Sequence, residues 1–588
     1  MNFTRFTTVT FLAASVAAFL FTVPAFAAGQ KLPGIAGDGV KDDTAALQAI
    51  LDETGKAGGQ VELAAGRYLI KGFLTIPTGV TLKGTWEAPH HGVWDKGTTL
   101  LLTAGRGHED GPASISLKES AAIKGVTMIW PEEKAENIVP YPWAIRGTGM
   151  HNTVENVTLV NAYQGIKIGD PWSELHFIRN VFGCVLRRGI FIDSTSDIGR
   201  IENVHFNTHY WIRSRYPGIQ AQDDGATGRL VTGFAQKNLE AFIFGRTDWE
   251  YVANTFVWGA KIGYKFIHTK DGECNGQFMG IGADACDVGL QIDAIQSIGI
   301  QVTNGEFTAF EGPNRAGVLV SPGAAGAAQF VNCNFWSTPG GAAVIHGDIQ
   351  AVFNACHFTD HSDTGVLQAD AGSINVSNCL FAAGTNAITL KQGVKAAIVT
   401  GNLQPGGLNY DNQIGEAAQF GLNQKAAVIP EAVLGHYRVG IGSANDSPVV
   451  GVGWYDGEGA DDAPAELNSK KPTARWSNGH GTLHLPVKSG TAYTLTVWLL
   501  TRPGTPAAAI KIPGIADTPI AVGQTQKLTV HIPASATQGS QVVNVSLDGP
   551  PWTPRALIQG STDGRNLGVR VFAVDMKADG GPDAAAGL

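Results

Sequence analysis

Three acidic residues occupy the same position relative to a repeated asparagine, which makes them candidates for chemistry. Each lies six residues before its asparagine, the pairs being Glu174 with Asn180, Asp197 with Asn203, and Asp248 with Asn254. If each asparagine marks one turn of a stacked chain, carboxylates on adjacent turns lie about 5 Å apart, and those two turns apart lie about 9.6 Å apart. These separations match the retaining and inverting arrangements of glycoside-hydrolysing carboxylates. Two negative charges this close raise at least one pKa and so supply a protonated acid.

A fourth acid, Glu250, alternates with Arg246 and Asp248 along one segment. In an extended strand, side chains two positions apart share a face, with their Cα atoms about 6 to 7 Å apart. The catalytic candidates are therefore Asp248, Glu250, Asp197 and Glu174. The alternative is a solvent-facing row of ion pairs formed by Arg200, Glu202, Arg246 and Glu250.

Aromatic, basic and imidazole side chains near these acids supply groups that hold a sugar. Aromatic faces stack on sugar rings, while Arg and His bind hydroxyl or carboxylate groups. A long insertion between Phe206 and Ala241 is rich in such residues, and insertions of this kind often form binding loops. The neighbours His90 and His91 point to opposite sides of a strand, so we expect no metal site there. The expected substrate-binding residues are Arg200, Arg246, Trp249, Glu202, His205, His90, His91 and Trp143.

Two independent repeats predict the scaffold that positions these residues. An asparagine series and a glycine series share a period of about 22 to 28 residues, which is typical of a solenoid. We interpret it as a parallel β-helix, in which an asparagine at an inward turn bonds its neighbours above and below. The asparagines are Asn156, Asn180, Asn203, Asn254, Asn304, Asn332 and Asn378, and the glycines are Gly165, Gly189, Gly263, Gly289, Gly317 and Gly365.

The cysteines follow the same period. Cys333, Cys356 and Cys379 are each 23 residues apart, and Val157 and Val181 hold the same position in other turns. We therefore predict an interior apolar stack rather than disulfides for these three. The sequence leaves Cys184, Cys274 and Cys286 undetermined.

Composition and charge exclude several classes of protein. The chain has 588 residues, with 42 Lys and Arg against 51 Asp and Glu, and only 16% are charged, so neither a disordered nor a nucleic-acid-coating protein is expected. Residues 1–27 carry one basic residue, an apolar run and a small-residue cleavage site, which predicts a signal peptide. No later apolar run is long enough for a membrane span. A secreted or periplasmic protein is predicted, with a carbohydrate as its partner.

The N-terminal part of the mature chain predicts a lid on the solenoid and carries a family resemblance. An Asp or Thr cap precedes apolar residues at helical spacing, and strands follow it. The runs GDGVKDDTAALQAIL and GGQVELAAGRYLIKGFLTIPTGVTLKG resemble the N-terminal signature of pectate-lyase-like, right-handed β-helix proteins, including relatives of polygalacturonase-type glycoside hydrolases. The resemblance covers roughly residues 31–405 and implies fold more than chemistry.

No catalytic residue is carried over from that family. Gly479-His480-Gly481 looks like one of its motifs, but it lies beyond the last predicted turn of the solenoid. Asp223-Asp224 looks like a paired aspartate, but it lies in an insertion outside the asparagine series. The candidate site therefore depends on coil geometry alone.

The predicted fold class is all-β, with two domains. A right-handed parallel β-helix with an N-terminal capping helix occupies residues 28–429. Alternating apolar runs separated by Gly, Pro and Asn then predict a smaller antiparallel β-sandwich at 430–577, followed by a flexible tail at 578–588. The sandwich is expected either to bind carbohydrate or to pack against the β-helix.

Three functional classes remain. The first, which we favour, is a glycoside hydrolase that uses two carboxylates and no cofactor. The second is a polysaccharide lyase, in which acids hold Ca²⁺ against a uronate while Arg or Lys removes a proton. The third is a non-catalytic glycan-binding surface protein. The arginines among the acids, and the lack of a dense Asp cluster in the sequence, favour the first.

Overall fold

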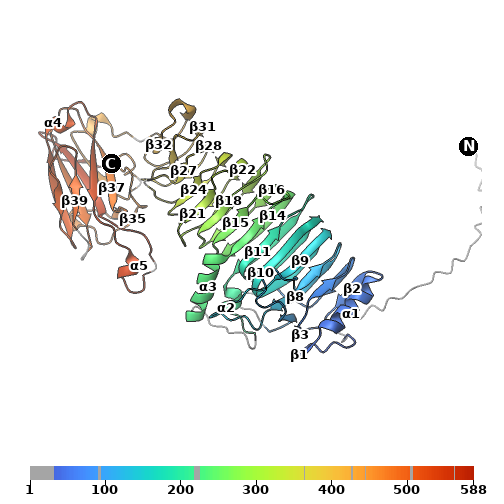
Figure 1. Cartoon of the computed structure of the whole chain (residues 1–588). Helices are drawn as coiled ribbons and strands as arrows, with labels where there is room; N and C mark the ends of the chain where they lie inside the picture. The colour runs from blue at the N-terminus through green and yellow to red at the C-terminus, as the bar shows by residue number, and fades with distance from the viewer. Residues whose placement is uncertain are drawn as a thin grey trace, which may run out of the picture.

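The chain forms one long solenoid of parallel strands followed by two further sheets (Figure 1). The computed structural model describes residues 32–89, 95–216, 225–362, 364–425, 428–443, 445–502, 507–561 and 563–587. Within the solenoid, equivalent residues of successive coils pair in parallel, as Val157 does with Val181 and Val181 with Val204. This pairing confirms the predicted stacked coils and the all-β class.

The solenoid strands form three ladders along its length. The first ladder contains β4 Leu74–Ile76, β7 Ile115–Leu117, β9 Trp143–Met150, the ends of β10 Thr153–Glu174 and β11 Phe177–Ile192, β13 Glu240–Phe244, β15 Ile262–Phe266, β18 Val288–Ile292, β21 Ala316–Val320, β24 Gly341–Ile345, β27 Leu367–Ala369, β30 Ile388–Leu390 and β32 Tyr410–Asn412.

The second ladder contains β2 Gly59–Glu62, β5 Val80–Lys83, the starts of β8 Ala122–Ile129, β10, β11, β12 Arg200–Asn207 and β14 Thr247–Trp258, then β16 Cys274–Met279, β19 Ile300–Thr303, β22 Ala325–Val331, β25 Asp348–Asn354, β28 Ser373–Ser377, β31 Ala396–Thr400 and β33 Ala418–Gly421. The third ladder contains β1 Asp38–Asp42, β3 Gly66–Ile70, β6 Thr98–Leu102, later parts of β8, β10, β11, β12 and β14, and then β17 Gly282–Asp284, β20 Glu306–Phe307, β23 Asn334–Phe335, β26 His357–Phe358 and β29 Leu380–Phe381.

Like side chains stack on one another inside the solenoid. The ring centres of Phe335 and Phe358 are 5.0 Å apart, and those of Phe358 and Phe381 are 4.8 Å apart. These distances match the spacing between paired strands. All six cysteines are free and buried. The predicted apolar stack of Cys333, Cys356 and Cys379 is therefore present.

The asparagine series forms the bend between the second and third ladders. All seven residues have φ between 52° and 58°, a left-handed conformation that Asn adopts more readily than most residues. The Asn180 Nδ2 donates to Asn156 Oδ1 at 2.8 Å, and the Asn203 Nδ2 donates to Asn180 Oδ1 at 2.8 Å. The expected inward orientation is wrong, since these side chains are half-buried or exposed. Valines such as Val181 already fill the interior beside the bend.

Helix α1 (Thr44–Gly55) lies at the N-terminal end of the solenoid (Figure 1). It packs against β2 and β4 and buries Leu47 and Leu51 in the solenoid core. The preceding Asp43 makes no side-chain cap of this helix. Its carboxylate instead accepts from the backbone N–H groups of Ala36 and Gly37, at 2.7 and 3.0 Å. Asp43 thus fixes the loop that enters the helix.

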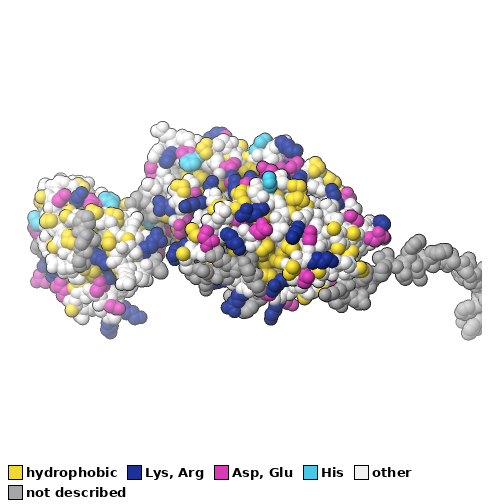
Figure 2. All heavy atoms as spheres, turned by 60° about the horizontal axis from the view of Figure 1, so that its bottom comes forward, with side chains coloured by type: hydrophobic (Ala, Val, Ile, Leu, Met, Phe, Trp, Pro, Cys, Tyr) yellow, Lys and Arg dark blue, Asp and Glu magenta, His cyan; other side chains and the backbone are white. Residues whose placement is uncertain are grey.

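An insertion between β12 and β13 carries helices α2 (His209–Ile212) and α3 (Ala226–Asn238). Both pack against β11. On the face of the molecule shown in Figure 2, Lys and Arg side chains are mixed with Asp and Glu and with hydrophobic side chains. No helix in the described residues is long and apolar enough to cross a membrane. The predicted signal peptide, residues 1–27, lies outside the described residues.

The C-terminal region contains two sheets that share one hydrophobic core, to which Leu485, Leu495 and Val545 belong. The 7-stranded sheet contains β34 His436–Gly440, β35 Glu458–Gly459, β36 Thr473–Trp476, β38 Tyr493–Leu500, β41 Thr525–Ile532, β43 Arg570–Ala578 and β44 Ala586–Gly587. The 4-stranded sheet contains β37 His480–Pro486, β39 Ala508–Lys511, β40 Thr518–Ile520 and β42 Val542–Asp548, and short helices α4 Ala534–Thr537 and α5 Pro554–Leu557 lie between strands. In the segment expected to be a flexible tail, the structure places β44 beside β34.

Candidate functional site

The acids Glu174, Asp197 and Asp248, here called the acidic row, lie at the bend between the first and second ladders. The backbone N–H of Leu175 donates to the Asp197 carbonyl at 3.2 Å, so Glu174 and Asp197 occupy equivalent positions on adjacent coils. Arg200 pairs with Tyr251 on the next coil. Asp197 lies three residues before Arg200, and Asp248 lies three residues before Tyr251, so these two acids also occupy equivalent positions on adjacent coils. Because each coil rises by about 4.8 Å, the row extends over roughly 10 Å of the solenoid.

Asp248 is the most strongly held member of the acidic row. Its carboxylate accepts two hydrogen bonds from the Arg246 guanidinium, at 2.8 and 2.5 Å. It also accepts from Asn275 Nδ2 at 2.9 Å and from Gln296 Nε2 at 2.8 Å. A bidentate arginine and two amides fix the orientation of this group.

The other two members make fewer hydrogen bonds than Asp248. Glu174 is half-buried and accepts one hydrogen bond, from the Ser196 hydroxyl at 2.6 Å. Ser173 pairs with Thr195, so Ser196 is an extra residue before Asp197 in its coil. Asp197 is exposed, and no other side chain in the described parts of the chain hydrogen-bonds to its carboxylate. Glu174 and Asp197 are therefore the two carboxylates of the row that are least engaged by other side chains.

Glu250 lies inside the solenoid, although it was expected to share a face with Arg246 and Asp248. Its side chain is fully buried and bonds His176 Nε2 at 3.0 Å and the Thr247 hydroxyl at 2.8 Å. The reason is Trp249, whose φ of 53° bends the chain and ends the two-residue alternation. His176 was not singled out from the sequence, because no spacing rule pairs it with a residue so distant.

Two exposed tryptophans flank the acidic row. Trp249 follows Asp248 directly and is 57% exposed, and Trp172 lies two residues before Glu174 and is 41% exposed. Only Trp249 was predicted from the sequence. The signal that could have identified Trp172 is its position two residues before Glu174. Flat apolar rings beside carboxylates are what a sugar-binding surface requires.

The charged residues of the second ladder form a separate row beside this bend. Residues Lys124, Glu155, Arg179 and Glu202 pair from coil to coil, so their charges alternate in sign. The Lys124 Nζ lies 3.2 Å from Glu155. Glu202 therefore belongs to this alternating row, and Arg200 is exposed on the same strand, β12. The expected row of Arg200, Glu202, Arg246 and Glu250 does not form, because Glu250 is buried and Arg246 pairs with Asp248.

The remaining expected binding residues lie elsewhere. Trp143 is buried at the start of β9, with its ring 6.3 Å from that of Phe191. His205 lies on the outer face of the third ladder and bonds the Tyr210 hydroxyl at 3.0 Å. His90 and His91 lie outside the described residues, as do Asp223 and Asp224. In the described residues no three His, Cys, Asp or Glu side chains are grouped to hold a metal ion.

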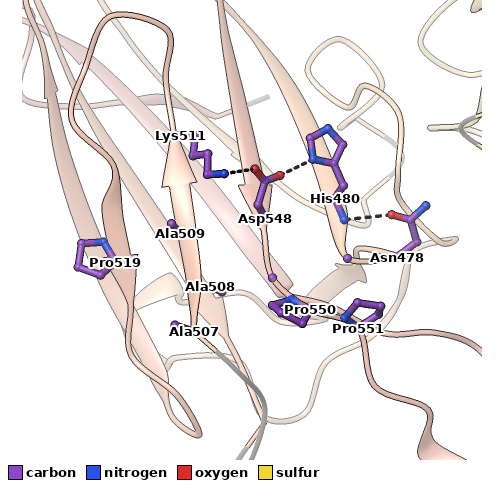
Figure 3. A pocket seen from close by; sticks show the side chains of 12 residues that line it. Asn478, His480, Ala507, Ala508, Ala509, Lys511, Pro519, Asp548, Pro550 and Pro551 are labelled. Atoms are coloured by element: carbon purple, nitrogen blue, oxygen red, sulfur yellow. Dashed lines mark hydrogen bonds and ion pairs between the residues drawn. The ribbon is translucent and has the colours of Figure 1, made fainter.

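His480, from the Gly-His-Gly sequence, begins strand β37 and lines a pocket of the 4-stranded sheet (Figure 3). Its imidazole and the Lys511 ammonium both contact the carboxylate of Asp548 on the neighbouring strand. Partial burial of Asp548 opposes them, yet these two contacts lower the pKa of Asp548 below its ordinary value. The motif is thus part of an ion-pair network far along the chain from the acidic row.

Comparison with known proteins supports the N-terminal resemblance. Residues 32–93 match a family model described as rhamnogalacturonase A/epimerase, pectate lyase-like. No curated protein sequence matches the chain significantly.

Several solved structures are similar to the chain at low identity. The mannuronan C-5 epimerase AlgE6 A-module of Azotobacter vinelandii is 14% identical, with a TM-score of 0.36, over 68% of this chain and 98% of that one. The DFA-IIIase of Arthrobacter chlorophenolicus A6, without its lid, is 11% identical, with a TM-score of 0.38, over 67% and 97%. The tailspike gp49 of Acinetobacter baumannii bacteriophage Fri1, a capsular polysaccharide depolymerase, is 12% identical, with a TM-score of 0.28, over 93% and 84%. The N-terminal segment of the chain is thus pectate-lyase-like in sequence.

Proposed function

We propose that the protein is a secreted or periplasmic carbohydrate-active enzyme, a glycoside hydrolase that acts at the acidic row. The observation that supports this most is the backbone register that puts the half-buried Glu174 and the exposed Asp197 on adjacent coils. A rise of about 4.8 Å per coil is close to the carboxylate separation of retaining enzymes. Trp172 and Trp249 supply the ring faces on which a sugar stacks.

Each acid has a distinct role in this proposal. Glu174 donates its proton to the glycosidic oxygen while the Asp197 carboxylate attacks the anomeric carbon, so the leaving sugar departs and an ester to Asp197 forms. Glu174 then takes a proton from water, which attacks the anomeric carbon and releases Asp197. Asp248, held by Arg246, accepts hydrogen bonds from sugar hydroxyls.

A polysaccharide lyase is the second candidate, because basic side chains gather beside the acidic row. Lys167 and Lys270 lie 3.1 and 3.4 Å from Asp170, and Arg146 lies 3.8 Å from it. A lyase base must lose its proton before it can act. The charge of Asp271, assisted by Asp170, raises the pKa of Lys270, which opposes that step. We favour the hydrolase because two carboxylates of the acidic row lie on adjacent coils.

Digestion of a glycan panel by the full chain tests the proposal. We expect new reducing ends without the ultraviolet absorbance of an unsaturated uronide, and a product whose anomeric configuration, followed by NMR, equals that of the substrate. Asp197→Asn should abolish turnover, whereas the matched control Glu155→Gln, in the alternating row, should leave it unchanged. Full activity of Asp197→Asn would contradict the site. Unsaturated products would instead identify a lyase, and glycan binding with no product would identify a binding protein.

A further inference from the structure

A second surface feature lies on the third ladder, separated from the acidic row by the second ladder and the asparagine bend. It is a groove between the outer face of β11, β12, β14 and β17 and the short helix α2. We call it the aromatic groove. Its main lining residues are Phe182, His205, Phe256, Trp258, Arg213 and Asp284.

The floor of the aromatic groove is a strip of ring side chains on successive coils. Phe182 pairs with His205, and His205 pairs with Phe256, so the three rings follow one another at the coil spacing of about 4.8 Å. The His205 and Phe256 ring centres are 5.3 Å apart. Trp86 extends the strip, since its ring stacks on that of Phe182. Phe256 remains 36% exposed, which is unusual for a ring so well placed to pack.

A glycine on the next coil keeps this ring accessible. Gly282 pairs with Phe256, and a Cβ at Gly282 would lie 2.7 Å from the Phe256 ring. The absence of a side chain lets the ring lie across this coil. Beyond it, Trp336 donates its indole N–H to Glu306 at 2.9 Å and is 40% exposed. Aromatic surface therefore continues along the solenoid past the end of the groove.

Among the described residues that line the aromatic groove, Asp284 and Arg213 carry opposite charges, and Asn203, Asn207 and Asn254 add amide groups. Asp284 pairs with Trp258 on adjacent coils and accepts a hydrogen bond from the Thr308 hydroxyl at 2.5 Å. Arg213, directly after α2, supplies the opposite charge. A neutral sugar presents flat C–H faces and hydroxyl groups. The planar rings of the aromatic groove match the first, and its hydrogen-bonding groups match the second.

We propose that the aromatic groove binds a neutral glycan chain that runs across the coils, at a site distinct from the acidic row. Sugar rings stack on Phe256 and Trp258, and Asp284 and Arg213 bind hydroxyl groups. The groove holds substrate on the solenoid while another part of the polymer reaches the acids. This binding does not depend on the acids, so it remains even if the acidic row has no catalytic role.

Calorimetric titration of the full chain tests the proposal, with a Glu174→Gln background to prevent turnover. The probes are three neutral hexasaccharides, cellohexaose, maltohexaose and xylohexaose, and one anionic hexasaccharide, a galacturonate hexamer. We expect one neutral probe to bind, and Phe256→Ala and Trp258→Ala each to weaken it by about tenfold or more. The control Phe310→Ala, an exposed phenylalanine away from the groove, should leave the affinity unchanged.

Four results would overturn the proposal, three of them in the binding of the probes. These three are no binding of any neutral probe, binding of the galacturonate hexamer alone, and equal affinity in the parent and in both groove variants. Phe256→Ala removes a partly exposed ring, so it is expected to fold, and circular dichroism checks that. Loss of binding in Trp249→Ala but not in Phe256→Ala would assign the glycan to the acidic row instead.

Discussion

The two bends on either side of the second ladder differ although they belong to the same coils. At the asparagine bend asparagine recurs with φ between 52° and 58°, and pairs of its side chains bond across adjacent coils. Within this series only small residues, Gly280 and Ala355, replace it in two of the described coils. At the bend of the acidic row the residue types vary, and Ser196 is inserted before Asp197. Repetition stabilises a solenoid, because each coil supports the next. The irregular bend of the acidic row gains no such stability from repetition. We therefore place the chemistry at this bend.

The largest expected effect comes from removing the proposed general acid, Glu174, from the irregular bend. Glu174→Gln cannot protonate a leaving group, so hydrolysis of a natural glycan should fall by about 10²- to 10⁴-fold. Aryl glycosides with good leaving groups need no protonation, and their first step should be nearly unaffected. Rates on both substrates measure the contrast. An equal loss on both would give Glu174 a role other than that of acid.

The buried pair beneath the acidic row offers the second test. His176→Ala leaves the buried Glu250 with only the Thr247 hydroxyl as a partner, and the free energy of unfolding should fall by about 3–5 kcal/mol. Glu250→Gln keeps a hydrogen-bonding group of the same size, so it should lower the free energy of unfolding by less than His176→Ala does. Urea unfolding measures both. If Glu250→Gln retains its stability but loses all turnover, Glu250 is catalytic and the distinction between the exposed acids and the buried one fails.

The sequence predicted the regular parts of the molecule better than the irregular ones. The asparagine and cysteine spacings were sufficient to predict the stacked coils, because equivalent residues recur at a nearly constant period from coil to coil. The same register put Glu174 and Asp197 on adjacent coils. It failed at Glu250, since the left-handed conformation of Trp249 cannot be read from a residue type that rarely adopts it. Helix α1 was expected, but the role of Asp43 depends on a loop with no repeat.

A third test uses a buried acid in a loop that belongs to no ladder. Glu133, between β8 and β9, is buried and accepts a hydrogen bond from the Val139 backbone N–H at 2.8 Å. Burial raises the pKa of Glu133 to about 7 from an ordinary 4.5. The folded protein therefore binds the proton more tightly than the unfolded chain does. The resulting stability is complete below about pH 4.5 and is lost as the pH rises through about 7.

Glu133→Gln should remove this pH dependence. The variant carries no ionisable group at the site, so at pH 8 it should be more stable than the parent by about 3 kcal/mol, the equivalent of the pKa shift. Thermal unfolding at several pH values between 4 and 8 measures the difference between the two proteins. A difference that does not change with pH would show that Glu133 stays ionised in the folded protein.

The smallest effect compares one substitution at each bend. Asn203→Ala loses the hydrogen bond to Asn180 and puts alanine in a strained left-handed conformation. The free energy of unfolding should therefore fall by about 2 kcal/mol. Asn203→Gly tolerates that conformation and should lose only about 1 kcal/mol. Ser196→Ala removes the hydrogen bond to Glu174 at a half-buried position, so it should change activity more than stability. If Ser196→Ala destabilises as much as Asn203→Ala and leaves turnover unchanged, both bends are structural, and the catalytic assignment loses its basis.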